Sequence, residues 1–159
     1  PCRVKVRILS VGTKMPAWVQ EGIAEYQKRL VADLDFSLIE IPMAKRTKNS
    51  NIDQCRKKES DALLASIPSG DYVVALDVSG KSFSTEDLAG KIADFRQRGD
   101  NLSLLVGGPD GLGAECLTRA SERWSLSALT FPHPLVRVVI TEQFYRAISI
   151  IKGHPYHRS

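Results

Sequence analysis

Short hydrophobic runs of strand length alternate along this chain with longer segments in which apolar residues recur at helical spacing. The pattern predicts strands at residues 4–11, 36–41, 72–77, 102–106 and 124–131. It predicts helices at residues 16–31, 52–66, 84–99, 114–122 and 134–151. The third and fourth runs are continuously apolar, which is typical of strands covered on both faces. Strands that alternate with helices predict an α/β fold with a mainly parallel sheet.

Several residues mark where these elements are expected to begin, end or face the core. Ser84 with Asp87 resembles a capping box at the start of the third helix. Gly80 and Lys81 are expected in the loop after the third strand. The inward-facing residues expected of the second helix are Ile52, Cys55, Leu63 and Leu64.

Composition narrows the class of protein. The chain has 159 residues, of which 43% are hydrophobic and 25% charged, so we expect residues 1–159 to form one soluble domain. No apolar run approaches the ~20 residues of a membrane helix, and the N-terminal segment lacks the apolar region of a signal peptide. The three cysteines include no CxxC pair, which argues against a disulfide framework. We therefore expect a cytoplasmic protein that does not span a membrane.

The last predicted helix, residues 134–151, is apolar around most of its circumference. A surface helix normally shows one apolar stripe, so a second apolar face needs a second partner. In a small domain the second partner is often another subunit, so the pattern favours a homodimer. The alternative is a central helix packed wholly inside one chain. Arg137 lies between Val136 and Val138 within this helix, and we expect a specific partner to hold it.

A glycine-rich segment, GGPDGLG at residues 107–113, follows the fourth strand directly. Ligands of α/β sheets bind beyond the carboxyl ends of strands, where Gly107 and Gly108 would let backbone approach a ligand closely. The segment is neither G-x-G-x-x-G nor a P-loop, which disfavours dinucleotides and nucleoside triphosphates. The alternative is a plain tight turn, with Asp110 serving that turn.

Two later segments carry further candidate chemistry. LSALTFPHP, at residues 126–134, can line a slot for a flat ring, or it can be a buried strand ended by a proline turn. The tail HPYHR, at residues 154–158, offers a base, an anion clamp and a stacking ring, or it is a flexible end. His154 and His157 have no carboxylate or cysteine nearby in the sequence, so we expect no metal.

Positive charge gathers in the polar loop at residues 43–51 and at the start of the helix after it. The residues are Lys45, Arg46, Lys48, Arg56, Lys57 and Lys58. Such a cluster is either a solvated face or a surface that contacts phosphates. The net charge of +4 permits a polyanionic partner without establishing one. Neither G-x-S-x-G nor H-E-x-x-H occurs, so nucleophilic or zinc hydrolase chemistry has little support.

Four segments together carry a resemblance to a known family. They are VGTKMPAWV at 11–19, LLVGGPDGL at 104–112, WSLSALTFPHPLVRV at 124–138 and HPYHR at 154–158. From its first strand to its last residue, the chain resembles the RlmH family of the SPOUT methyltransferase superfamily. The resemblance implies a Rossmann-like, mainly parallel sheet of five or six strands with a deep C-terminal trefoil knot. It also implies a homodimer that uses S-adenosylmethionine to methylate N3 of a pseudouridine in a 23S rRNA hairpin, with the assembled ribosome as the expected substrate.

The resemblance further implies which residues act. The implied cofactor-binding residues are Leu76, Gly107, Leu126, Ser127, Ala128, Leu129, Thr130 and Phe131. Tyr156, His157 and Arg158 are implied to lie near the target base or its phosphates. Our hypothesis is that His157 removes the N3 proton and Arg158 stabilises the developing negative charge; water as the base is the alternative. A non-catalytic RNA-binding module, a nicotinamide-dependent oxidoreductase and a structural dimer are the competing interpretations.

Overall fold

The computed structural model describes residues 4–127 and 129–158. Over these residues, strands and helices alternate from one end of the chain to the other. They are β1 (Lys5–Val11), α1 (Ala17–Leu30), β2 (Asp35–Ile41), α2 (Ile52–Ala65), β3 (Tyr72–Ser82), α3 (Thr85–Arg98), β4 (Leu102–Val106), α4 (Ala114–Arg119), β5 (Glu122–Ser125) and α5 (His133–Ile151). The strands form one sheet in the order β2-β1-β4-β3-β5, and every neighbouring pair is parallel. The prediction of an α/β fold with a parallel sheet is confirmed.

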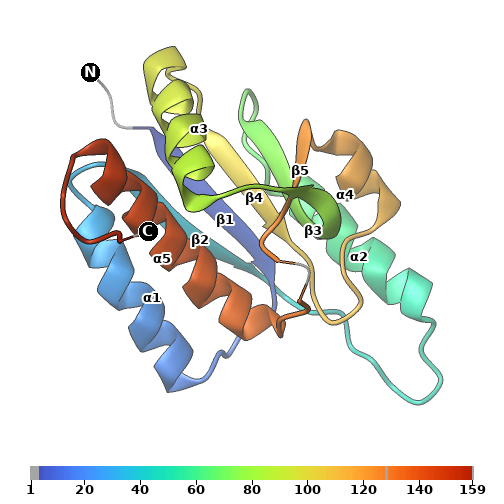
Figure 1. Ribbon diagram of the computed structural model, residues 1–159. Helices are drawn as coiled ribbons and strands as arrows, with labels where there is room; N and C mark the ends of the chain where they lie inside the picture. The colour runs from blue at the N-terminus through green and yellow to red at the C-terminus, as the bar shows by residue number, and fades with distance from the viewer. Residues whose placement is uncertain (1–3, 128, 159) are drawn as a thin grey trace.

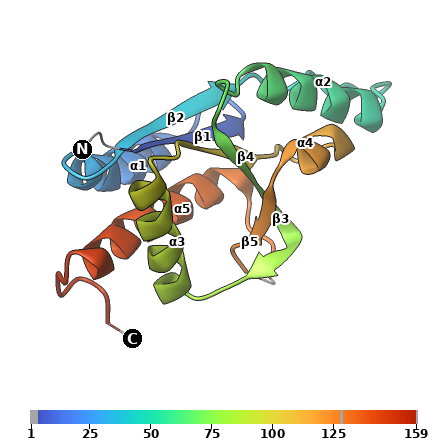
Figure 2. The ribbon, with the colours of Figure 1, turned by 90° about the horizontal axis from the view of Figure 1, so that it is seen from above.

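Helices cover both faces of the sheet. In Figures 1 and 2, α1, α3 and α5 lie on one face, and α2 and α4 lie on the other. The larger core lies under the first group and includes Leu104, whereas the smaller core includes Leu105, the next residue of the same strand. All five residues of β4 are buried, as expected of a central strand in a two-sided sheet.

The boundaries of two strands differ from the prediction. β3 runs on to Ser82, so the placement of Gly80 and Lys81 in a loop is wrong. After an irregularity in the register, Lys81 pairs with Trp124 of β5. Gly80 permits this approach, because a Cβ there would lie 2.7 Å from the backbone of Arg123. Conversely, the strand predicted at 124–131 already ends at Ser125, and the following residues form a loop.

Two predictions about helices have opposite outcomes. Ser84 and Asp87 form the capping box at the start of α3, which confirms that prediction. Ile52 is 56% exposed, so its assignment to the inward face of α2 is wrong. It is the first residue of that helix, directly after the N-cap Asn51, and therefore lies beyond the turns that pack on the sheet. Cys55 and Leu63 are buried as expected.

Many apolar residues of α5 pack against other elements of the same chain. It lies between α1 and α3 over the sheet (Figure 1). Phe144 packs on Phe36 of β2 with ring centroids 5.9 Å apart, and Tyr145 packs on Tyr26 of α1 at 6.1 Å. Neighbours within one chain thus cover much of the circumference that led us to expect a second subunit, and the homodimer stays a prediction.

Arg137 of α5 is fully buried and has specific partners, as predicted. Its Nη1 donates to Glu40 Oε2 at 2.7 Å, and its Nη2 donates to the carbonyl oxygens of Gly12 at 2.7 Å and Val11 at 3.2 Å. A charged donor is worth more than a neutral one in such a setting. Arg137 therefore ties the first turns of α5 to the carboxyl ends of β1 and β2.

We expect Arg137→Met to lower the free energy of unfolding by about 2–4 kcal/mol, because two buried carbonyls lose their charged donor. Urea denaturation measures this change. Arg96→Met, on the exposed side of α3, is the control and should change stability by about 0.5 kcal/mol or less. Equal stability of the two variants would show that the buried guanidinium does not hold α5 in place.

Candidate functional site

A cavity of about 610 Å³ opens at the carboxyl edge of the sheet. Its walls are the ends of β3, β4 and β5, the loops after them, and the first turns of α5. We call it the glycine-turn cavity. The volume lies in the range of small-molecule sites. The carboxyl edge is where ligands bind in parallel sheets.

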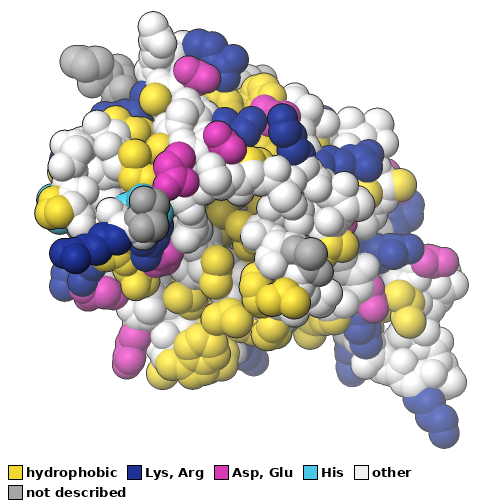
Figure 3. Space-filling model, in the orientation of Figure 1, with side chains coloured by type: hydrophobic (Ala, Val, Ile, Leu, Met, Phe, Trp, Pro, Cys, Tyr) yellow, Lys and Arg dark blue, Asp and Glu magenta, His cyan; other side chains and the backbone are white. Residues whose placement is uncertain are grey.

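The glycine-turn cavity collects the residues that the resemblance implied for cofactor binding. Those that line it are Leu76, Gly107, Leu126, Ser127, Leu129, Thr130 and Phe131. Ala128, the remaining one, lies outside the described residues. Segments that lie far apart in the sequence thus share one cavity. Two hydrophobic residues of its lining are exposed, Leu129 at 69% and Val78 at 63%. Hydrophobic side chains also gather on the lower part of the face shown in Figure 3.

The glycine segment forms the wall through a tight turn. The Gly111 N–H donates to the Gly108 carbonyl at 3.0 Å, and Gly111 has a φ of +78°. A Cβ at Gly107 would lie 2.4 Å from the Gly111 backbone. A Cβ at Gly108 would lie 2.9 Å from the side chain of Val11. The segment is a tight turn and also lines the cavity. The two interpretations of it, a turn and part of a ligand site, are therefore compatible.

The loop at residues 126–131 is shaped by serine hydroxyl groups. Ser125 Oγ donates to the Ser127 carbonyl at 3.0 Å, and the Leu129 N–H donates to Ser127 Oγ at 3.0 Å. These bonds lie directly after Ser125, the last residue of β5, where the strand was predicted to continue. The described residues of this loop belong to no strand, so their backbone polar groups can meet a ligand.

Three ionisable residues of the cavity wall were not predicted as site residues: Asp77, Asp110 and His133. Asp77 follows the apolar part of β3, so the rule applied to Gly107, the carboxyl end of a strand, would have found it. Asp110 was expected only to serve the turn, but its Oδ2 accepts a hydrogen bond from Arg46 Nε at 2.8 Å. His133 opens α5, and it belongs to the segment at 126–134 that was expected to line a slot, although it was not itself singled out.

His133 brings an unsatisfied polar atom to the wall. Its Nδ1 is buried and has no hydrogen-bond partner among the described residues. Burial lowers the pKa of His133, and the positive charge of Arg137 lowers it further, against a weaker opposite effect of Glu59. Both effects favour the neutral ring, in which one nitrogen can accept a hydrogen bond.

The tail lies elsewhere in the same chain, since neither Tyr156, His157 nor Arg158 lines the cavity. Tyr156 donates to Glu142 Oε1 at 3.1 Å. His157 Nε2 lies 2.9 Å from Glu86 Oε1, and its Nδ1 lies 3.2 Å from Arg146 Nη1. The described tail thus packs against α3 and α5, and the structure does not bring it together with the predicted cofactor residues.

Other classes of site find no candidate in the part of the chain that the structure describes. No group of three His, Cys, Asp or Glu residues there could hold a metal ion. No helix among these residues is both long and apolar enough to cross a membrane. Cys55 and Cys116 are buried free thiols.

Comparison with known proteins identifies relatives over nearly the whole chain. A family model described as "Predicted SPOUT methyltransferase" matches residues 4–157. The "Ribosomal RNA large subunit methyltransferase H" of Marinomonas sp. is 53% identical over 155 residues, which cover 98% of this chain and 100% of that relative. The protein of the same name from Saccharophagus degradans is 52% identical with the same coverage.

Solved structures agree on the fold. A "Probable Methyltransferase from Bordetella pertussis" superposes with a TM-score of 0.58 at 12% identity, over 91% of this chain and 96% of that one. A "probable methylase family protein from Haemophilus influenzae" gives 0.53 at 9% identity, over 98% and 70% of the two chains. At such low identity, the likeness concerns the fold alone.

The lowered pKa of His133 predicts a pH effect on stability. Because the folded ring resists protonation, its contribution is fully present above the unfolded pKa of about 6.5 and is lost as the pH falls below that value. His133→Gln should therefore lose less free energy of unfolding than the parent chain between about pH 7.5 and pH 5.5. Urea denaturation at both pH values measures this, with the exposed His154→Gln as control. Identical losses in the parent and His133→Gln would contradict the prediction.

Proposed function

The chain belongs to the SPOUT methyltransferase family, and from this we propose that it transfers a methyl group from S-adenosylmethionine to large-subunit ribosomal RNA. The observation that carries the proposal is the glycine-turn cavity, which every described residue of the implied cofactor pocket lines. The names of relatives that are 50–53% identical support the RNA substrate. We further propose, from the resemblance, that the acceptor is N3 of a pseudouridine in a 23S rRNA hairpin.

The chemistry of the cavity wall fits this cofactor. Leu76, Leu126 and Phe131 provide apolar surface for a flat ring, and the loop at 126–131 provides backbone groups to its edge. The carboxylate of Asp77 can accept hydrogen bonds from hydroxyl groups and complement positive charge, whereas Asp110 is already paired with Arg46. S-adenosylmethionine supplies, when bound, a methyl group carried on a positively charged sulfur.

Positioning is the main contribution expected of the protein. The tight glycine turn and the start of α5 hold the walls of the cavity in fixed places, and orientation of two reactants is worth up to about 7–11 kcal/mol. N3 of a neutral pseudouridine carries a proton that must leave. A residue that accepts this proton would add about 10²–10⁴-fold to the rate.

The tail is our candidate for the group that accepts the N3 proton and for the contacts with RNA phosphates. Because His157 and Tyr156 pack on α3 and α5 of their own chain, we propose that they serve the cavity of a second copy in a homodimer. The exposed side chains of Leu129 and Val78 beside the cavity support a covering partner. The trefoil knot implied by the resemblance stays a prediction.

The function is tested on ribosomes from a strain that lacks this protein. Incubation with the purified chain and S-adenosylmethionine should add one methyl group to one pseudouridine of 23S rRNA, detected by mass spectrometry. Assembled ribosomes should react faster than naked 23S rRNA, because the folded ribosome can supply contacts in addition to those of the target hairpin. A chain that binds RNA but shows no affinity for the cofactor in calorimetry would instead be a non-catalytic RNA-binding module. Binding of NADH would favour an oxidoreductase.

We expect Gly107→Ala to weaken S-adenosylmethionine binding by roughly tenfold or more, a loss of about 1.4 kcal/mol, because its Cβ must displace the Gly111 backbone. Calorimetric titration measures the affinity. Gly90→Ala in α3 is the matched control, since a Cβ there meets nothing within 4 Å. Unchanged affinity in Gly107→Ala would place the cofactor outside the glycine-turn cavity.

The role of His157 is tested with two variants that break the same contact. If His157 is the base, His157→Ala should lower kcat by about 10²-fold or more, whereas Glu86→Gln should keep most of it. If the contact between His157 and Glu86 only anchors the tail, both variants should lose activity to the same extent. Undiminished turnover of His157→Ala would leave proton removal to water.

A further inference from the structure

A second cavity lies at the same edge of the sheet, between α2 and the loop at residues 42–51 that precedes it. Its volume is about 540 Å³, and its lining is polar and basic, with Lys45, Lys57, Lys58, Asn49 and Gln54 among its residues. We call it the basic groove. It shares no lining residue with the glycine-turn cavity.

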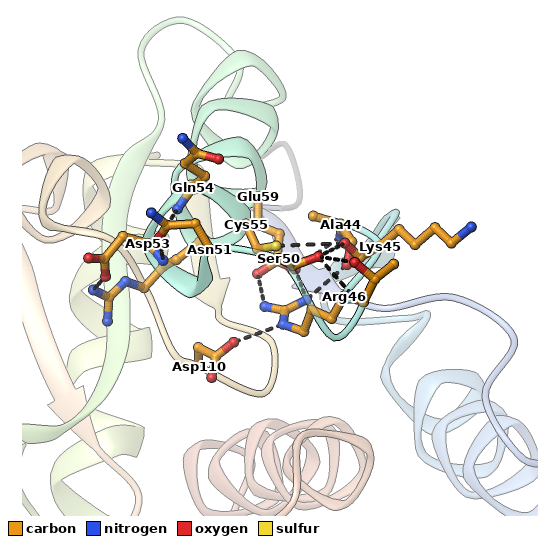
Figure 4. Close-up of polar contacts among 12 residues, drawn as sticks. Ala44, Lys45, Arg46, Ser50, Asn51, Asp53, Gln54, Cys55, Glu59 and Asp110 are labelled. Atoms are coloured by element: carbon orange, nitrogen blue, oxygen red, sulfur yellow. Dashed lines mark hydrogen bonds and ion pairs between the residues drawn. The ribbon is translucent and has the colours of Figure 1, made fainter.

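Arg46 holds the loop of the basic groove in place (Figure 4). Its Nη1 and Nη2 donate to the two carboxylate oxygens of Glu59 at 2.7 and 3.0 Å. Its Nε donates to Asp110 at 2.8 Å, and Asp110 lines the glycine-turn cavity. The side chain of Glu59 is only 2% exposed, so this pair is largely withdrawn from water. Arg46 therefore connects the loop to the glycine turn, and its guanidinium binds carboxylates, whereas the sequence had left solvent or phosphate as the alternatives for the basic cluster.

Further bonds fix the backbone of the loop. The Ala44 N–H donates to Glu59 Oε2 at 3.0 Å, and the Thr47 N–H donates to Ser50 Oγ at 2.7 Å. The Cys55 thiol lies 3.7 Å from the Lys45 carbonyl. An ordered loop loses little additional entropy when a ligand binds.

Three lysines of this surface have no ion-pair partner among the described residues, and the acidic residue of the groove lining is Asp61. Lys45, Lys48 and Lys58 are exposed, and the described residues form no ion pair with them. Lys57, by contrast, is paired with Asp61 at 3.4 Å. Lysine ammonium groups bind phosphates as point charges, and the amides of Asn49 and Gln54 add uncharged donors.

We propose that the basic groove binds the phosphodiester backbone of the RNA substrate through Lys45 and Lys58 of its lining and through Lys48, which is exposed on the same loop. The inference rests on the proposed function, because it concerns the same RNA. In a parallel sheet, the loops after β2 and β4 emerge at one edge, so RNA that presents a base at the glycine-turn cavity passes near the loop after β2. The hydrogen bonds of Arg46 hold the loop that carries Lys45 and Lys48 against α2 and the glycine turn.

The test replaces the three lysines together, as Lys45→Gln, Lys48→Gln and Lys58→Gln. Arg46 stays intact, since its removal would leave the buried Glu59 carboxylate unpaired. The matched control is Lys5→Gln, Lys28→Gln and Arg96→Gln, which removes the same charge. Those residues lie at the start of β1 and in the last turns of α1 and α3, near the opposite edge of the sheet.

We expect the groove variant to bind ribosomes at least about tenfold more weakly than the control at low salt. The slope of log affinity against log salt concentration should decrease by about 2–3, roughly one for each phosphate that a lysine no longer neutralises. Its KM for ribosomes should rise while kcat at saturation and calorimetric affinity for S-adenosylmethionine stay at the parent values. Together these results support phosphate binding at the groove.

Equal ribosome affinity and equal salt slope in the two triple variants would overturn the inference and leave the lysines as a solvated face. That result is distinct from failure of the proposed function, in which the parent chain itself neither binds S-adenosylmethionine nor methylates ribosomes. Weaker binding with an unchanged salt slope would also overturn it, because the lysines would then act through something other than phosphate charge.

Discussion

Parallel pairing of all five strands is the constraint on which the rest of this structure depends. It brings the carboxyl end of every strand to one edge of the sheet, so each loop that follows a strand begins there. The glycine turn after β4, the loop at 126–131 after β5 and the basic loop after β2 meet for this reason. Parallel strands must also be covered on both faces, and the apolar sequence of β4 meets that requirement.

Two arginines with buried partners connect the loops at this edge of the sheet. Arg137 of α5 donates to the ends of β1 and β2, while Arg46 joins the loop after β2 to α2 and to the glycine turn. Each arginine makes several of these hydrogen bonds through one planar guanidinium group, which has five N–H donors. Withdrawing such a group from water is costly, so these pairs define where the loops lie more than they add net stability.

Membership of the SPOUT family gives this edge its proposed chemistry, and the side chains of the edge separate two tasks. The glycine-turn cavity has apolar walls and the carboxylate of Asp77, which suit a small cationic donor of methyl groups. The basic groove has lysines free of acidic partners among the described residues, which suit a polyanion. The tail, with its contacts to Glu86 and Glu142, lies apart from both within one chain, and this separation is what makes a second subunit part of the proposed mechanism.

The sequence by itself determined the order and type of the helices and strands and the parallel sheet, because hydrophobic periodicity is a local property of a chain. The residues of the proposed cofactor pocket came from the family resemblance, which rests on contiguous motifs, and they stay a prediction. Only the tertiary structure decided that β3 extends through Gly80, that Arg46 binds Glu59 and Asp110 instead of solvent, that His133 faces the cavity, and that His157 lies against α3. Each of these depends on contacts between residues distant in sequence. Charge and burial at such positions are set by the neighbours that folding supplies, and no local pattern records them.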